Sequence, residues 1–276
     1  PDNILVSEEF AAKLEEYLAG GGKLIASGQS GLAPDKNAFA LKGLGVKLKS
    51  NAAPTWDEEK FGGSRHAYAD YILPRGEIGK GLPPTEHVMY MKGMEVEVDE
   101  DSEVLASVVL SYFDRTWEHF CSHRQTPSSG KIGYPGIVRN GNVIYFAHPI
   151  FTLYHVKGPK WCKTLLLNAI DILLPDPVVR HDGPSTMLLT VNEQPAENRW
   201  VVHLLHYIPE RRCQEIDVIE DVIPVFNVKL SVKTPRPVKA VTCVPEGQAL
   251  LFERKNDRVE FVIPKVEGHQ MIELAF

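Results

Sequence analysis

The chain has 276 residues, a formal net charge of −6 at pH 7, and ordinary shares of hydrophobic (43%) and charged (24%) residues. This length allows two globular domains, and the composition excludes disordered and collagen-like chains. The acidic balance and the absence of a concentrated Lys/Arg patch argue against nucleic-acid or anionic-membrane partners, and no apolar run approaches the roughly 20 residues of a membrane helix. We therefore expect a soluble, cytoplasmic protein.

The N-terminal segment predicts a helix that leads into a parallel sheet. Ser7 is placed to cap a helix over residues 8–19, which three glycines from Gly20 onwards would end. Residues 23–27 then form a short, nearly continuous apolar strand, as is typical of a sheet covered on both faces. The start at Pro1, without an initiator methionine, leads us to expect a first domain truncated at its N-terminus.

The middle of the chain predicts two strands, a hairpin and a second helix. Residues 89–98 and 104–110 favour strands, and the latter is apolar on both faces. Asn140-Gly141 indicates a tight hairpin, because this dipeptide tolerates positive φ angles. Pro159 begins a helix that extends to about Leu174. Its polar residues form one narrow stripe, and the rest is expected to be buried; the stripe consists of Lys160, Lys163, Thr164, Asn168 and Asp171.

A change of periodicity marks the domain boundary. Pro175-Asp176-Pro177 and Asp182-Gly183-Pro184 bracket it, so we expect domains over residues 1–180 and 181–276. Beyond it, apolar and polar residues alternate over 227–233 and 258–263, with turn signals between such segments. The fold predicted is therefore an incomplete α/β domain of the flavodoxin-like or amidotransferase-like type, followed by an all-β sandwich.

Two histidine clusters are candidate sites. His119 and His123 lie four residues apart, so on a helix both could face one metal ion. However, the segment lacks the glutamate that follows the first histidine in zinc proteases, and no third ligand is evident. With Trp117 and Arg124, the same loop could instead stack on and hydrogen-bond a sugar, and a third interpretation is structural packing. We expect no zinc and no cofactor, since the four cysteines also lack CxxC spacing.

The second cluster contains His148 and His155, which follow the hairpin strand. His148 at a strand end is a candidate ligand-binding residue, although a ring that only bonds nearby backbone is an equal alternative. Serine catalysis is not supported in Gly28-Gln29-Ser30-Gly31-Leu32, because Leu32 stands where a nucleophile elbow needs glycine. Gly28 and Gly31 are therefore expected to serve a strand-to-loop turn. Because both histidine clusters follow strands, we expect them at one end of the sheet.

Several stretches resemble known families. Leu18 to Ser27, followed by Gly31, resembles the trimerisation domain of family-42 β-galactosidases, which has a class I glutamine amidotransferase-like fold. Three further stretches are similar to glycoside hydrolases that carry this domain behind a TIM barrel, a group similar to the family-151 α-L-fucosidases. These stretches are His148 to His155, Leu167 to Pro175 and His206 to Arg212.

The resemblance implies a non-catalytic region of a glycosidase. Amidotransferases use a cysteine elbow and a His-Pro-Glu segment, whereas here the elbow cysteine is missing and Ile150 follows His148-Pro149, so no neighbouring carboxylate orients the histidine. In the resembled enzymes both glycosidase carboxylates come from the barrel. We therefore expect a chain that is inactive alone, with an upstream TIM-barrel catalytic domain as partner, a homo-oligomeric assembly and an oligosaccharide substrate.

Two other classes of function remain open. The sandwich could be a carbohydrate-binding module, although few exposed aromatic pairs are visible in residues 184–276. An independent metal-dependent enzyme would use His119, His123, His148 and His155. Metal analysis of the purified protein separates this last possibility from the others.

Overall fold

The computed structural model describes residues 1–49, 69–113, 118–122 and 126–276. The chain divides into two compact units, Pro1–Pro175 and Asp176–Phe276. Each unit has its own hydrophobic core. We describe the two units separately.

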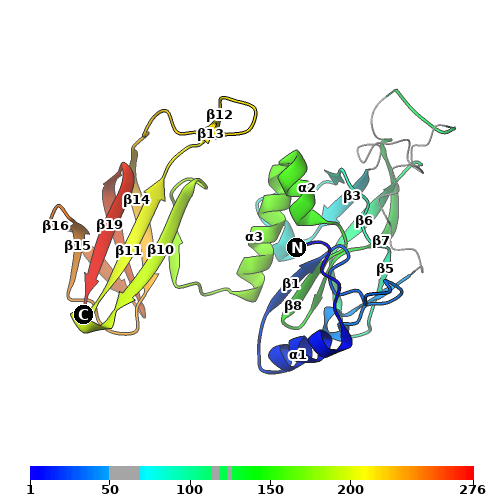
Figure 1. Ribbon diagram of the computed structural model, residues 1–276, viewed down its shortest axis with the longest axis horizontal. Coiled ribbons are helices and arrows are strands. Elements are labelled where there is room, and N and C mark those ends of the chain that lie inside the picture. The colour runs from blue at the N-terminus through cyan, green and yellow to red at the C-terminus, as the bar shows by residue number, and fades with distance from the viewer. Residues whose placement is uncertain (50–68, 114–117, 123–125) are drawn as a thin grey trace. The chain divides into compact units, whose positions relative to one another are not determined.

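The first unit is built on a six-stranded sheet with the order β1-β8-β7-β6-β3-β4 (Figure 1). Only β1 and β8 pair in parallel, and every other neighbouring pair in this sheet is antiparallel. The strands are β1 (Leu24–Ser27), β3 (Asp70–Pro74), β4 (His87–Met89), β6 (Glu103–Ser111), β7 (Ser128–Asn140) and β8 (Val143–Phe146).

This topology contradicts the predicted flavodoxin-like or amidotransferase-like α/β domain. A doubly wound sheet needs a crossover helix between successive parallel strands, whereas β3–β4, β6–β7 and β7–β8 are antiparallel neighbours in both sequence and space. The described residues contain three α-helices against nineteen strands. The prediction assumed that the other strands of the sheet would be parallel like β1, and that assumption was wrong.

Helices cover both faces of the sheet in the first unit. On one face, α2 (Ile150–Lys157) and α3 (Lys160–Leu173) pack against buried residues that include Ile72, Ile137 and Phe146. On the other face, α1 (Glu8–Ala19) contributes Leu14 and Leu18 to a second cluster around Tyr145. The helices η1 (Lys42–Leu44) and η3 (Gly76–Gly79) and the two-stranded pair β2 (Val46–Leu48) and β5 (Val96–Val98) complete the unit.

Several local predictions are confirmed. Helix α1 occupies residues 8–19, and the Ser7 side chain accepts a hydrogen bond from the Phe10 amide, as an N-cap should. β7 and β8 form the predicted hairpin, with Gly141 at φ 53° in its two-residue loop. In contrast, residues 89–98 do not form one strand: β4 ends at Met89, and β5 begins at Val96 in a different sheet.

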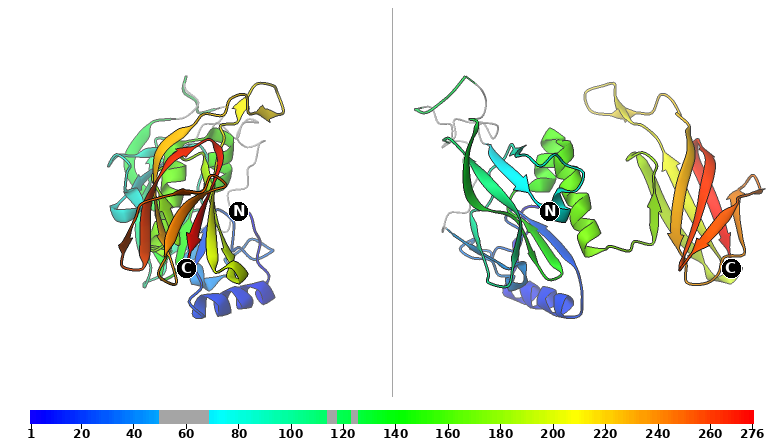
Figure 2. Two further views of the ribbon diagram at one scale, coloured as in Figure 1. Left: turned by 90° about the vertical axis from the view of Figure 1, so that its left-hand side faces the viewer. Right: turned by 180° about the vertical axis from the view of Figure 1, so that it is seen from behind.

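The second unit consists of two antiparallel sheets that share one core, as in a β-sandwich (Figure 2). The five-stranded sheet has the order β10-β11-β19-β15-β16, and the four-stranded sheet has the order β17-β18-β14-β9. The five-stranded sheet contains β10 (Met187–Gln194), β11 (Arg199–His206), β15 (Ala240–Val244), β16 (Gln248–Ala249) and β19 (Gly268–Ala275). The other contains β9 (Val179–His181), β14 (Val225–Lys233), β17 (Phe252–Lys255) and β18 (Arg258–Val266).

Two smaller elements complete the second unit. The helix η4 (Pro195–Glu197) joins β10 to β11, and β12 (Glu210–Arg211) pairs with β13 (Asp217–Val218) in the excursion between β11 and β14. In the parts of the chain that the structure describes, no helix has the length and apolar character needed to cross a membrane.

Candidate functional site

A buried polar cluster joins three strands at one end of the first unit's sheet. Oδ2 of Asp70, at the start of β3, accepts a hydrogen bond of 2.6 Å from the Tyr134 hydroxyl and one of 3.1 Å from the Gly93 amide. Nε2 of His148, just beyond β8, lies 3.2 Å from the same oxygen. All three side chains are buried, and the Tyr134 and His148 rings stack with centroids 6.5 Å apart.

The ionisation of this cluster is set by a competition between burial and polar contacts. Burial alone would raise the pKa of Asp70, but the hydrogen bond and charge of His148, together with Tyr134 and Gly93, hold the pKa of this carboxyl below its usual value. Burial, and then the Asp70 charge, raises the pKa of Tyr134 well above its usual value. The cluster therefore contains an ionised carboxylate with three donors.

This geometry corrects one sequence interpretation and weakens another. The His-Pro-Ile segment offers no carboxylate of its own, yet His148 is oriented by a carboxylate that comes from β3. Because His148 is fully buried, it has no surface on which to contact a substrate, which favours the structural interpretation of this residue. Its Nδ1 is buried without a hydrogen-bond partner among the described residues. Through its contacts with Tyr134 and His148, Asp70 connects β3 to β7 and to the segment that follows β8.

Asp2 forms a second buried polar contact, at the start of α2. Its Oδ1 accepts a hydrogen bond of 2.5 Å from the Ser27 hydroxyl. Its Oδ2 accepts bonds of 2.6 Å from both the amide and the hydroxyl of Thr152. The N-cap residue Pro149 makes no side-chain cap, so Asp2 supplies the acceptor that the first turn of the helix lacks. The chain start is thereby tied to the end of β1 and to α2.

The loop after β6 and the segment after β8 leave the sheet at different levels, because Ser111 at the end of β6 pairs with Ser128 whereas Phe146 at the end of β8 pairs with Ile137. β6 and β8 both run antiparallel to β7 and therefore parallel to each other, as Figure 1 shows. The loop is anchored at its base, where the Thr126 hydroxyl donates to the Phe113 carbonyl at 2.7 Å and the Tyr71 hydroxyl donates to the Thr126 carbonyl at 2.8 Å. Its described part presents exposed aromatic side chains.

We call these side chains the aromatic rim: Tyr112, Phe113 and Phe120, with exposed fractions of 68%, 39% and 70%. His119 is exposed in the same loop, and its ring lies 5.9 Å from that of Phe113. The sequence analysis named His119 but none of the three rim residues, although three aromatics within nine positions are a visible signal. The rim offers rings on which the apolar face of a sugar can stack.

The other predicted site residues are distributed differently. Trp117, His123 and Arg124 lie outside the described residues. His155 is exposed on α2, whereas His148 is buried, so these two histidines do not form one accessible cluster. No group of three or more His, Cys, Asp or Glu side chains suited to a metal ion occurs within residues 1–49, 69–113, 118–122 and 126–276.

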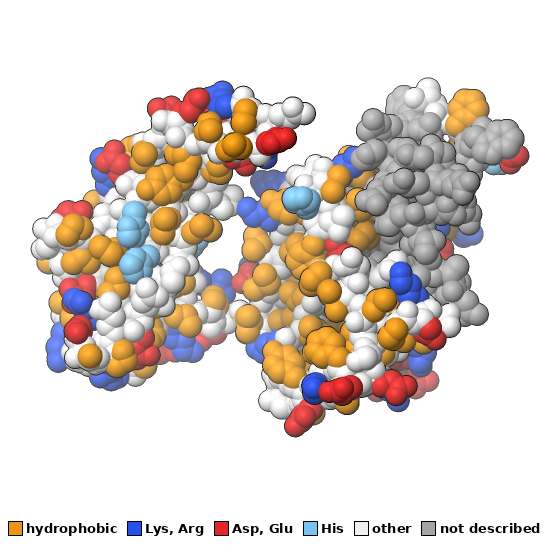
Figure 3. All heavy atoms as spheres, in the orientation of Figure 1, with side chains coloured by type: hydrophobic (Ala, Val, Ile, Leu, Met, Phe, Trp, Pro, Cys, Tyr) orange, Lys and Arg blue, Asp and Glu red, His pale blue; other side chains and the backbone are white. Residues whose placement is uncertain are grey.

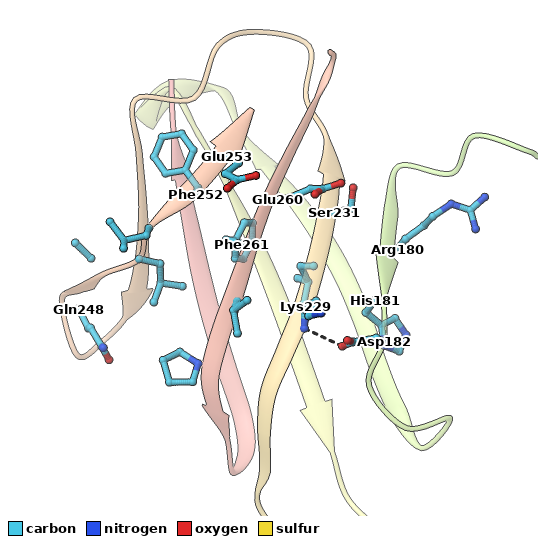
Figure 4. A pocket seen from close by; sticks show the side chains of 16 residues that line it. Arg180, His181, Asp182, Lys229, Ser231, Gln248, Phe252, Glu253, Glu260 and Phe261 are labelled. Atoms are coloured by element: carbon cyan, nitrogen blue, oxygen red, sulfur yellow. Dashed lines mark hydrogen bonds between the residues drawn. The ribbon is translucent and has the colours of Figure 1, made fainter. Parts of the chain in front are cut away.

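The second unit has a groove of about 900 Å³ on its four-stranded sheet (Figure 4). Polar groups of the groove bond to other residues of the protein. The Lys229 amide donates a hydrogen bond to Asp182 at 2.8 Å, and Glu260 forms an ion pair with Lys255 at 2.5 Å. The aromatic residues that line it are the half-buried Phe252 and the buried Phe261. The groove thus lacks an exposed ring for sugar stacking, which leaves the carbohydrate-binding module with little support.

Comparisons with known proteins show a similarity to the solved structure of an enzyme. No protein-family model matches the chain, and no curated protein sequence does. The solved structure of α-L-fucosidase isoenzyme 2 from Paenibacillus thiaminolyticus is similar, with a TM-score of 0.89 and 31% sequence identity. The similarity covers 100% of this chain and 40% of the fucosidase chain. Over its whole length, the chain is therefore similar to a region of a glycoside hydrolase.

Proposed function

We propose that this chain is a non-catalytic region of a glycoside hydrolase that acts on oligosaccharides such as α-L-fucosides or β-galactosides. The observation that carries the proposal is the similarity to 40% of an α-L-fucosidase chain. Hydrolysis of a glycoside needs two carboxylates that flank the scissile bond. Asp2 and Asp70 are buried and hydrogen-bonded within the fold, which supports a structural role for both. The proposal assigns catalysis to a barrel domain upstream or in a partner subunit.

In this proposal the aromatic rim and His119 shape the substrate pocket of the catalytic domain. Binding residues often lie on loops that a rigid scaffold positions, and the rim lies in the loop that follows β6. Exposed aromatic rings contribute contact area at little cost in conformational entropy, and an imidazole nitrogen can hydrogen-bond a sugar hydroxyl. Trp117, His123 and Arg124 belong to the same loop and are proposed to share this role.

The proposal also includes assembly into a homo-oligomer. The outward side of α3 carries Leu167 and Ile170, which are 51% and 43% exposed, and Leu174 at the C-cap of the helix is 50% exposed. A second copy of the chain is the proposed occupant of this face. Light scattering of the purified chain measures whether it forms such an oligomer.

Substitution of the rim tests the pocket-shaping role. In the glycosidase that carries this chain, Phe120→Ala is expected to lower kcat/KM about tenfold, because a lost aromatic contact is worth ~1.4 kcal/mol. His119→Ala should act in the same direction. Thermal melting should be unchanged, since the Phe120 side chain is 70% exposed.

The matched control is Val104→Ala, which trims an exposed apolar side chain at the opposite end of β6. It should leave kcat/KM unchanged. Unaltered kinetics in both Phe120→Ala and His119→Ala, or an equal loss in Val104→Ala, would remove the rim from the substrate pocket.

A further inference from the structure

Two histidines stand side by side on the outward face of the five-stranded sheet. In β11, Val202 and Leu204 point into the core, so the intervening His203 points outward. In β19, the same alternation around Ile272 places His269 outward. Both imidazoles are exposed or half-buried, and Figure 3 shows two adjacent histidine side chains on this surface.

The two rings are hydrogen-bonded to each other through facing nitrogens. Nδ1 of His203 lies 3.1 Å from Nε2 of His269, and the ring planes differ by 8°. Two nitrogens bound at about 2.0–2.1 Å to one tetrahedral zinc ion stand about 3.3 Å apart. The separation therefore fits a shared metal ion without movement of either strand. In the metal-free protein, one ring must donate its N–H to the lone pair of the other, and a metal would replace that shared proton.

The strand positions opposite the pair carry uncharged side chains. Register places Thr190 and Met271 directly opposite His203, and Leu205 opposite His269, so no positive charge faces either ring from these positions. The ion pair of Arg199 with Glu273 lies further along the sheet and is internally balanced at 3.2 Å. The Met271 thioether is a soft ligand within the same row, and imidazole suits zinc and copper.

We infer that His203 and His269 bind a divalent transition-metal ion of the zinc and copper class, with water completing the coordination. The described residues offer no third His, Cys, Asp or Glu at this position, so the site holds the metal by two protein nitrogens and exchanges it readily. The bound ion would join β11 to β19 and would stabilise the second unit by mass action. This site is separate from the histidine clusters near the first unit's sheet.

Calorimetric titration of tag-free, metal-stripped protein with Zn²⁺ tests the inference. One ion per chain is expected, with binding weakened by at least about tenfold in His203→Ala and in His269→Ala, because loss of a direct ligand should cost no less than loss of a supporting contact. His181→Ala, an exposed histidine of the same unit, is the control.

A thermal melt adds a second readout. Zn²⁺ should raise the melting temperature of the second unit in the unsubstituted chain and in His181→Ala, but in neither His203→Ala nor His269→Ala. The inference is overturned by unchanged Zn²⁺ binding in both variants, or by an equal loss in His181→Ala. It is also overturned by the absence of binding in the unsubstituted chain. Circular dichroism without metal verifies that the variants are folded.

Discussion

Replacement of Asp70 by Ala is expected to destabilise the first unit by ~3–5 kcal/mol, because each buried polar group that loses its hydrogen-bond partner costs ~1–3 kcal/mol. Three donors lose their acceptor together: the Tyr134 hydroxyl, the Gly93 amide and Nε2 of His148. Native-state hydrogen exchange followed by mass spectrometry measures the effect, because peptides from β3 and β8 report on this unit separately from the sandwich.

A graded series separates the contributions within this cluster. Tyr134→Phe removes one hydrogen bond and leaves the Asp70–His148 contact, so it should cost only ~1–2 kcal/mol. Asp70→Asn keeps an acceptor but removes the charge, and it should fall between the other two. A loss below ~1 kcal/mol for Asp70→Ala would show that the cluster does not hold the strands together.

The same cluster should make the first unit sensitive to acid. The pKa of Asp70 is lowered in the folded protein, so its stabilising contribution is fully present above the unfolded value of about 3.9. That contribution is lost as the pH falls through the folded pKa. Asp70→Asn should therefore flatten the pH dependence of exchange in the acidic range, while Tyr134→Phe should retain part of it.

Gly28→Ala is expected to have the second large effect, a destabilisation of ~2–4 kcal/mol. Gly28 has φ 57°, in the left-handed region where a side chain is strained. A Cβ at this position would lie 2.7 Å from the Asp2 carbonyl oxygen. That oxygen accepts the Gln29 amide at 2.7 Å, so any shift would disturb the contact that ties the chain start to β1.

Gly141→Ala is the matched control, because Gly141 has nearly the same φ, 53°, but open space within 4 Å of the added carbon. It should show only the conformational cost, ~1–2 kcal/mol. The difference between the variants then isolates the steric conflict. Equal destabilisation of the two would mean that the close approach of Asp2 to Gly28 does not matter. Urea unfolding followed by hydrogen exchange in the first unit provides the comparison.

Local features of the fold could be predicted because their causes are local. The Ser7 side chain bonds an amide three residues away, and the loop of the β7–β8 hairpin contains two residues. Gly28 and Gly31, which the sequence placed in a turn, have φ values of 57° and 99°. Each of these depends on the backbone preference of a few neighbouring residues, which the sequence shows directly.

Strand partners could not be predicted in the same way. The predicted parallel sheet required β6 to be joined to its neighbours by helices, but β6 pairs with β7 and β3 in antiparallel fashion. Burial of α3 was also overestimated: Leu167 and Ile170 are 51% and 43% exposed, although the sequence pattern places them outside the polar stripe. Periodicity shows which residues are apolar, but not which surface covers them.

The polar cluster was beyond sequence reasoning for a related reason. Asp70 and His148 are 78 positions apart, and only the order of strands brings them to 3.2 Å. The sequence singled out His148 from its place at a strand end, but it could show neither its carboxylate partner nor its complete burial. For the aromatic rim the opposite holds, since Tyr112, Phe113 and Phe120 are close in sequence and could have been found.

The most direct measurement is a glycosidase assay of the purified chain with aryl α-L-fucoside and aryl β-galactoside substrates, in parallel with a protein that joins this chain to the proposed catalytic domain. We predict no turnover above the uncatalysed rate by the chain alone, and turnover by the joined protein. Turnover by the chain alone that is abolished by substitution of one of its own carboxylates would contradict the non-catalytic assignment.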